Sequence, residues 1–294
     1  MNWLTVIVIV ALLIIFPHLR IIVLNPIKTI VHSIKDFYLY VRYRKWNICK
    51  AYGFIDMYCS DTSKVFGNGK TCSGTHACLE ISRMYNDKKV YDFDKKEWVK
   101  QRVFIMSNVY IDVPNYIHLK NAVQITEFHQ YQKSTDVLIV FVDECGILFN
   151  SRNYKENIGA DLLNSMLTCR KKKFGMILTA QRFNQVDALI RQLTSRVIMC
   201  DKWWRAVVLR VFNGYDMEYC TNPDLLTHRT TGYFATNKLF NAYDTNQGVE
   251  DLRKKVQAGE MLTDYEILES QGYDNGSIEN VRSGNRKFKK RWKK

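Results

Sequence analysis

The fold is decided by one apolar stretch, Asp136-Val137-Leu138-Ile139-Val140-Phe141-Val142-Asp143-Glu144. An unbroken run of β-branched, aliphatic and aromatic residues is typical of a strand buried on both faces, as in a parallel sheet. Two carboxylates, Asp143 and Glu144, stand at the carboxyl end of this strand, and α/β sheets bind ligands at that edge. The stretch therefore predicts a parallel α/β sheet with an acidic pair at its binding edge.

A second motif lies upstream of this strand. Residues 53–60 are expected to form a strand and residues 72–85 a helix, and between them stands Lys64-Val65-Phe66-Gly67-Asn68-Gly69-Lys70-Thr71. This stretch matches the Walker A pattern Gly-x-x-x-x-Gly-Lys-[Ser/Thr] except that Lys64 replaces the first glycine. Backbone N–H groups of such a loop bind phosphate at the N-terminus of the following helix. We expect the ATP-binding residues to be Gly67, Asn68, Gly69, Lys70, Thr71 and Cys72.

The two motifs together predict an ATP hydrolase with ATP and Mg²⁺ as cofactors. Lys70 would reach the β- and γ-phosphates, and the hydroxyl of Thr71 would bind Mg²⁺. Asp143 would hold the same ion through its water shell, and Glu144 would orient and deprotonate the attacking water. Gln181 follows the next apolar strand, and its amide would sense the γ-phosphate or the lytic water.

The order of the elements predicts the fold class. A strand, a phosphate loop and a helix are followed by further strands with helices between them, including strands at 174–179 and 196–200. This order is typical of α/β proteins, and it favours a doubly wound, mainly parallel P-loop NTPase sheet. Residues 203–211 are expected to form an edge strand, and Asn213-Gly214 to form the turn of a hairpin.

The N-terminus predicts a transmembrane helix in the segment 1–25. Every residue from Trp3 to Phe16 except Thr5 is apolar, and continuing to Leu24 gives about 22 residues, enough to cross a bilayer. A cleaved signal peptide is the rival interpretation, but no basic residue precedes the stretch and no small-x-small cleavage site follows it. Because Lys and Arg follow this helix, we expect a single pass through the inner (cytoplasmic) membrane of the host cell, with the ATPase domain in the cytoplasm.

The net charge of +14 lies in two flanks of the chain. Residues 20–50 carry a net charge of +6 and residues 282–294 a net charge of +8, so residues 51–281 are neutral. Residues 26–50 form a basic juxtamembrane segment with apolar residues at helical spacing. They predict either an amphipathic helix on the inner leaflet or an ordinary helix packed on the domain.

The rest of the chain divides into three parts. Residues 51–250 would form the ATPase domain, residues 251–281 a polar extension and residues 282–294 a basic disordered tail. This tail would bind single-stranded DNA, dock on anionic lipid, or only keep the chain soluble. The eight cysteines contain no Cys-x-x-Cys pair and lie in apolar runs, which indicates reduced, buried thiols.

Two stretches resemble a known family, Val142-Asp143-Glu144-Cys145-Gly146-Ile147-Leu148-Phe149-Asn150-Ser151-Arg152 and Ile177-Leu178-Thr179-Ala180-Gln181. They look like the zonular occludens toxin-like ATPases, which include the gene I assembly proteins of filamentous phages and lie within the FtsK/HerA pumping ATPases. The likeness covers roughly residues 50–250. In the filamentous-phage proteins the membrane helix usually follows the ATPase domain, whereas here the apolar segment precedes it, as in conjugative coupling proteins.

The resemblance implies a membrane-anchored motor that uses Mg-ATP hydrolysis to drive phage DNA assembly, extrusion or packaging. The alternatives are a conjugative-type DNA translocase and a non-hydrolysing membrane scaffold with a degenerate P-loop. Implied partners are DNA, with single-stranded DNA as one candidate form, other assembly or export proteins, and further copies of the chain in a hexameric ring. An arginine from the adjacent subunit would complete each catalytic site in such a ring; Arg152 is the first choice for this residue and Arg191 the second.

Overall fold

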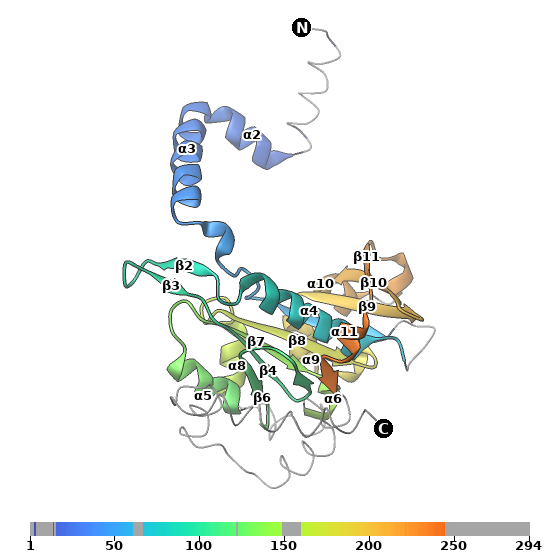
Figure 1. The fold of residues 1–294 in the computed structure, drawn as a ribbon. Helices are drawn as coiled ribbons and strands as arrows, with labels where there is room; N and C mark the ends of the chain where they lie inside the picture. Colours follow the sequence, from blue (N-terminus) through green and yellow to red (C-terminus); the bar gives the residue numbers. More distant parts are fainter. Residues whose placement is uncertain are drawn as a thin grey trace, which may run out of the picture. The chain divides into compact units, whose positions relative to one another are not determined.

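The computed structural model describes residues 3, 14, 16–60, 67–121, 123–148, 160–220 and 222–244. The chain divides into two units, and each is described by itself. One unit comprises residues 1–48 and 89–99, and the other comprises residues 49–88 and 100–294 (Figure 1).

The first unit consists of helices and one hairpin. Its elements are α2 (Pro17–Leu24), α3 (Pro26–Arg42), the 3-10 helix η1 (Lys45–Asn47), β2 (Lys89–Asp92) and β3 (Glu97–Lys100). Strands β2 and β3 pair with each other as a separate two-stranded sheet. No residue of α2 or α3 is buried.

The second unit is built on an eight-stranded sheet in the order β11-β10-β9-β1-β8-β7-β4-β6. Six adjacent strands are parallel: β9 (Arg196–Trp203), β1 (Ile55–Ser60), β8 (Phe174–Ala180), β7 (Val137–Val142), β4 (Val103–Ser107) and β6 (Tyr116–His118). Two antiparallel strands, β10 (Ala206–Asn213) and β11 (Arg229–Phe234), extend the sheet beyond β9. A short ladder pairs β5 (Tyr110–Ile111) with β12 (Tyr243–Asp244).

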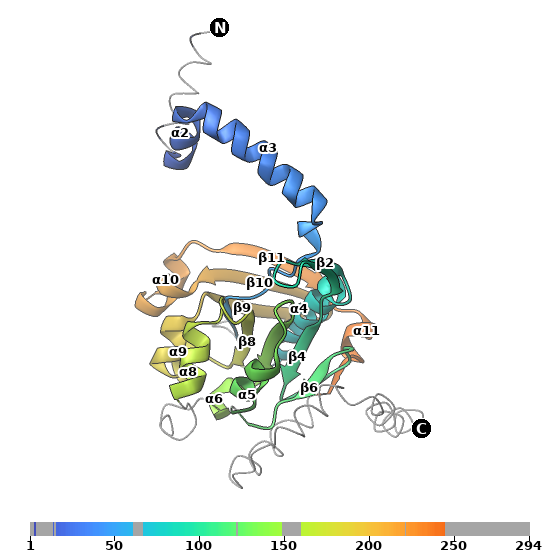
Figure 2. The ribbon, with the colours of Figure 1, turned by 90° about the vertical axis from the view of Figure 1, so that its left-hand side faces the viewer.

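Helices cover both faces of this sheet, as Figures 1 and 2 show. On one face α4 (Lys70–Tyr85) packs through Cys78 against residues such as Phe141 and Ile177. The opposite face carries α5 (Val123–Tyr131), α8 (Ala160–Leu167) and α9 (Ala188–Leu193), whose apolar residues pack against the other side of the same strands. The remaining elements are α6 (Cys145–Leu148), η3 (Phe183–Gln185), α10 (Gly214–Tyr219), η4 (Pro223–Leu225) and α11 (Asn237–Phe240).

The predicted α/β class and the mainly parallel sheet are confirmed. The strand at 136–144 is β7, the strand at 53–60 is β1, and the strand at 174–179 is β8. All six residues of β7 are buried, as expected for a central strand covered on both faces.

The predicted hairpin at Asn213-Gly214 is wrong. The side chain of Asn213 accepts a hydrogen bond from the backbone N–H of Tyr215 and caps α10 instead. The hairpin turn lies earlier, between β9 and β10, where Trp204 adopts a left-handed conformation with φ of 54°. The edge of the sheet is β11 rather than the strand predicted at 203–211.

Parts of the predicted organisation lie outside the described residues. They include most of the segment 1–25, Lys64 of the Walker A stretch, Arg152, and the extension and tail at 251–294. Within the residues that the structure does describe, no helix has both the length and the apolar character needed to span a membrane. The transmembrane helix therefore stays a prediction.

The burial of the cysteines predicts their reactivity. All eight thiols are free, and only Cys169 and Cys220 are not buried. Burial raises the pKa of Cys49 to about 11 and that of Cys200 to about 12, so little reactive thiolate forms near neutral pH. We expect a disulfide reagent at pH 8 to modify no more than these two partly buried thiols in the native chain and all eight after unfolding. Rapid modification of additional thiols in the native chain would contradict this arrangement.

Candidate functional site

Parallel pairing brings the ends of β1, β7 and β8 to one edge of the sheet. Strand β8 lies between the other two and pairs with both. The backbone N–H of Ser60, the last residue of β1, donates to the carbonyl of Gln181 at 3.3 Å. Gln181 therefore stands beside the point where the chain leaves β1 for the phosphate loop. Its predicted place, at the tip of a strand next to the strand of Asp143, is confirmed.

The second half of the phosphate loop turns through two glycines. Gly67 and Gly69 have φ angles of 77° and 79°, which residues with a side chain rarely adopt. Gly69 is the N-cap of α4, so the loop delivers its last backbone N–H groups to the N-terminus of a helix. This is the arrangement in which helices bind anions. Asn68, between the two glycines, is buried.

Lys70 is the first residue of α4 and its side chain is buried. Its Nζ donates a hydrogen bond to Oγ of Ser60 at 2.9 Å. A buried ammonium group is costly unless it has polar or charged partners. This hydrogen bond therefore joins the first residue of α4 to the last residue of β1.

Thr71 and Asp143 meet although they are 72 residues apart in the sequence. The hydroxyl of Thr71 donates to the two carboxylate oxygens of Asp143 at 2.8 and 3.0 Å. Both groups supply the hard oxygen atoms that Mg²⁺ prefers, so the pair fits the ion that the sequence predicts.

Asp143 is held by two residues that the sequence analysis missed. The side chain of Asn108 accepts from the backbone N–H of Asp143 at 2.8 Å and donates to its carbonyl at 2.9 Å. The hydroxyl of Thr179 donates to the Asp143 carboxylate at 2.6 Å. Burial raises the pKa of Asp143, and the hydrogen bonds from Thr179 and Thr71 and the charge of Lys70 lower it.

Glu144 occupies a left-handed backbone conformation, with φ of 50°. Such a conformation is unfavourable for a residue with a side chain and is common at functional sites. Its backbone N–H donates to the hydroxyl of Thr179 at 2.8 Å, which fixes the turn out of β7. Burial and then the neighbouring charge of Asp143 raise the pKa of the half-buried Glu144, and Lys70 lowers it.

The remaining predicted residues are Cys72, Arg191 and Arg152. Cys72 is buried in a cluster with Val207 and Leu239, and it accepts a hydrogen bond from the hydroxyl of Tyr233 at 3.6 Å. Nε of Arg191 lies 3.0 Å from the carboxylate of Glu218, an ion pair that joins α9 to α10. Arg152 lies outside the described residues.

The missed residues share a sequence signal. Ser60, Asn108 and Thr179 each end or closely follow a buried parallel strand, as Asp143 does. Polar residues at the carboxyl ends of such strands meet at one edge of a sheet. That rule identifies candidates, but it does not say which of them face one another.

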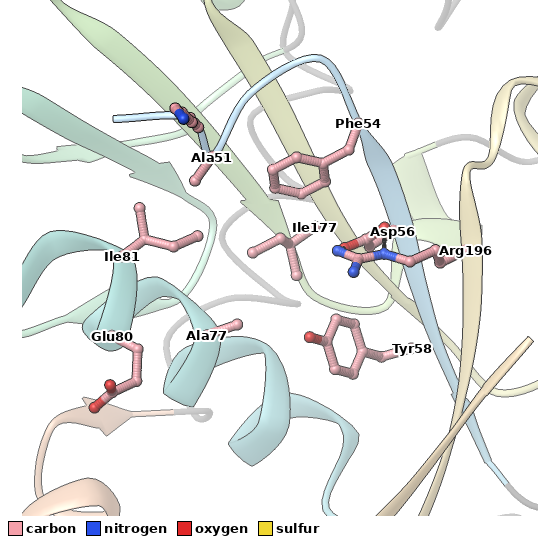
Figure 3. Close-up of a pocket in the computed structure, with 10 residues that line it drawn as sticks. Ala51, Phe54, Asp56, Tyr58, Ala77, Glu80, Ile81, Ile177 and Arg196 are labelled. Carbon is pink, nitrogen blue, oxygen red and sulfur yellow. Dashed lines mark hydrogen bonds and ion pairs between the residues drawn. The ribbon is translucent and has the colours of Figure 1, made fainter. Parts of the chain in front are cut away.

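A cavity of about 340 Å³ lies at the other end of β1, away from the phosphate loop. Figure 3 shows the guanidinium group of Arg196 against the carboxylate of Asp56, near the rings of Phe54 and Tyr58. Nε of Arg196 donates to Asp56 at 2.9 Å. Burial raises the pKa of Asp56 and the arginine opposes that change. None of the predicted site residues lines this cavity.

The chain is similar to several solved structures at low sequence identity. Three similar solved structures are the N-terminal domain of zonular occludens toxin from Neisseria meningitidis, the genome-packaging NTPase B204 from Sulfolobus turreted icosahedral virus 2 in complex with ATP-gammaS, and EssC (ATPases 2 and 3) from Geobacillus thermodenitrificans. Their sequence identities to the chain are 15%, 10% and 11%, with TM-scores of 0.43, 0.39 and 0.37. The matches cover 66%, 63% and 75% of this chain and 100%, 98% and 44% of those chains. No curated protein sequence matches.

The family model for zonular occludens toxin (Zot) matches residues 84–243. The matched segment begins after the phosphate loop and includes Asp143, Glu144 and Gln181. It spans more than half of the 294 residues. The chain therefore belongs to the zonular occludens toxin (Zot) family.

Proposed function

We propose that the chain is a Mg-dependent ATP hydrolase whose site is the edge formed by the ends of β1, β7 and β8. The observation that carries the proposal is the contact between Thr71 and Asp143 at 2.8 Å. This contact joins Thr71, at the end of the phosphate-loop motif, to Asp143, which directly follows strand β7. Binding of a Mg-nucleotide requires such a hydroxyl and such an acid close together. Glu144 and Gln181 lie at the same edge, in positions suited to acting on the end of the phosphate chain.

The residues at this edge divide the chemistry among them. The N–H groups at the start of α4 and the ammonium group of Lys70 would bind the phosphates. Mg²⁺ held near Thr71 and Asp143 would neutralise phosphate charge. Glu144 would accept a proton from the attacking water as a general base. Thr179 would position the two acids, because its hydroxyl bonds to the Asp143 carboxylate and to the backbone N–H of Glu144.

Family membership and the two basic flanks support a more specific proposal. The chain would be a membrane-anchored motor that drives phage DNA assembly, extrusion or packaging, with DNA and other assembly or export proteins as partners. A conjugative-type DNA translocase is the alternative, since the apolar segment of this chain precedes the nucleotide-binding unit. The other alternative is a non-hydrolysing membrane scaffold that has lost tight nucleotide binding through Lys64, and measured turnover separates it from a motor.

Hydrolysis is tested by variants of the full chain. We expect Lys70→Ala to abolish nucleotide binding, because the phosphates lose their buried cation. Glu144→Gln should bind ATP but turn it over about 10²-fold more slowly, because the amide accepts no proton. Thr179→Val should lower turnover while retaining binding, since it removes the hydroxyl that positions both acids.

The matched control for these variants is Glu80→Gln on the outer part of α4. Its carboxylate pairs with Arg83 within the same helix, so we expect turnover to be unchanged. Binding is measured by calorimetry, and turnover by phosphate release. If Glu144→Gln hydrolysed ATP at the rate of the unmodified chain, Glu144 would not be the base.

We further propose a homo-hexameric ring in which each site receives an arginine from its neighbour. The neutral charge of residues 51–281 makes close association electrostatically tolerable. Arg191 is paired with Glu218 within its own chain, which favours Arg152 as the residue that crosses between subunits.

The mixing of two inactive variants tests the shared site. Arg152→Ala and Lys70→Ala should each be nearly inactive, and mixed assemblies should regain activity because some interfaces combine an intact loop with an intact arginine. The measurement is ATP turnover across a series of mixing ratios, with exchange of subunits shown by mass spectrometry. Absence of any recovery in assemblies shown to be mixed would exclude Arg152 from this role.

The last part of the proposal is a single N-terminal span, with the N-terminus outside and residues 26–294 in the cytoplasm. It is supported by the apolar run Trp3 to Phe16 and the basic residues that follow it. A reporter that is active only outside the cytoplasm should give no signal when it is fused to the C-terminus, and alkaline extraction should leave the chain in the membrane. Isolation of a mature chain that begins near residue 20 would instead indicate a cleaved signal peptide.

A further inference from the structure

Helix α3 carries an apolar stripe that no other described residue covers. The stripe consists of Ile27, Ile30, Val31, Ile34, Phe37, Tyr38 and Val41, whose exposed fractions run from 47% to 78%. At 3.6 residues per turn these positions fall within about one third of the helix circumference. Soluble surfaces rarely leave so continuous an apolar patch in water, and such patches mark binding surfaces.

Cations line one border of the stripe. Lys28, Lys35 and Arg42 are seven residues apart, so they form a row along one side of the helix. Arg42 also donates to the hydroxyl of Tyr38 at 2.8 Å, which places its guanidinium group at the edge of the stripe. From residue 17 to residue 48 the chain has six basic residues and one acid. The stripe therefore lies on a strongly cationic helix.

An aromatic cluster fixes the end of α3 to the β2–β3 hairpin of the same unit. The ring of Tyr43 lies 4.5 Å from that of Tyr91 and 5.1 Å from that of Phe93, measured between centroids. Tyr91 in turn contacts Trp98 at 5.6 Å. The side chain of Asn47 adds a hydrogen bond to the carbonyl of Lys89. The C-terminal end of α3 and the β2–β3 hairpin are thus in direct contact.

Three aromatic rings near the C-terminal end of α3 are only partly buried. Trp46, Phe93 and Trp98 have exposed fractions of 49%, 54% and 47%, and the hairpin turn adds Lys95 and Lys96. Tryptophan, tyrosine and lysine side chains are favoured where acyl chains meet lipid headgroups. The exposed rings and the two lysines, which stand between Asp94 and Glu97, therefore suit a membrane-interface contact, as the helix does.

We propose that α3 and the β2–β3 hairpin form one module that lies in the surface of an anionic bilayer. The apolar stripe and the exposed aromatic rings would enter the interface, and the row of cations would bind the anionic headgroups. The module rests on the proposed membrane anchoring and deepens it, because only α2 separates α3 from the apolar segment Trp3 to Phe16. A bilayer is favoured over a second copy of α3, since two such helices would bring cationic surfaces together.

The experiment measures depth in the bilayer rather than binding, because residues 1–25 would hold the full chain on vesicles by themselves. In a full chain with Cys169→Ser and Cys220→Ser, a polarity-sensitive fluorophore is attached at Ile34→Cys, Lys95→Cys or Asp36→Cys. The vesicles contain phosphatidylcholine with or without about 30% phosphatidylglycerol, and a fraction of the acyl chains is brominated as a quencher. We expect quenching at positions 34 and 95 that increases with phosphatidylglycerol, and little quenching at position 36 on the opposite face.

A matched pair of charge variants tests the stripe itself. Ile34→Glu should reduce quenching at position 95 several-fold, because a carboxylate in the stripe opposes insertion. Ser33→Glu introduces the same charge one residue away, on the polar side of the helix, and should change quenching little.

Two outcomes overturn the inference. Unquenched labels at positions 34 and 95 on chains that resist alkaline extraction would leave the anchor intact and refute the module. Labels shielded in lipid-free detergent, with energy transfer between copies, would assign the stripe to a second copy of the chain. Loss of the chain on alkaline extraction, with quenching retained at both positions, would instead refute the span and support the module.

Discussion

The carboxylate of Asp143 is the point at which the separate parts of the site are held together. It accepts hydrogen bonds from Thr71 at the start of α4 and from Thr179 on β8, while Asn108 binds its backbone. A buried carboxylate is unfavourable unless donors surround it, so each of these groups must stay in place once Asp143 is buried. Three strands and one helix are therefore tied to a single residue, and Glu144 follows it through a turn that Thr179 fixes.

Some parts of this site can be predicted from the sequence, whereas others depend on the arrangement of the strands around Asp143. Strands β7 and β8 are short, mainly apolar runs, and such runs identify buried strands without any knowledge of their neighbours. Lys70, Thr71 and Asp143 belong to motifs with fixed spacing, so their meeting could be expected. Asn108 belongs to no motif, and Thr179 lies in a family-like stretch in which only Gln181 is assigned a role. Their roles depend on the order of strands in the sheet. The hydrophobic periodicity of a single sequence does not reveal that order.

The hairpin predicted at Asn213-Gly214 fails for a related reason. An Asn-Gly pair favours a tight turn between strands, but the same asparagine side chain caps helices equally well. The sequence does not distinguish the two uses. Here Gly214 also lies so close to the backbone that a Cβ atom would sit 2.0 Å from the carbonyl oxygen of Thr194. Gly214 is therefore required by its close approach to the backbone of Thr194, and not by a hairpin turn.

The two units use apolar residues in opposite ways. In the second unit the apolar residues of the central strands are buried under helices on both faces. In the first unit the seven stripe residues of α3 remain exposed, although they are as regularly spaced as those of a core helix. The basic residues that account for part of the net charge lie on this same exposed helix and its flanks. Among the described residues no core accounts for the amphipathic pattern of α3, and the proposed membrane module would account for it.

The position of Asp143 is itself set by close packing of α4 on the sheet. A Cβ atom on Gly74 would lie 2.3 Å from Cε2 of Phe141, so only glycine permits this approach. Glycine within a helix costs about 1 kcal/mol relative to alanine, and the approach it permits offsets that cost. Phe141 lies on β7 and Asp143 directly follows this strand, two residues later. Because alternate residues of an extended chain share a face, both side chains point to the face of the sheet that α4 covers. The packing that places Phe141 beneath Gly74 therefore also brings Asp143 within reach of Thr71, three residues earlier in the same helix.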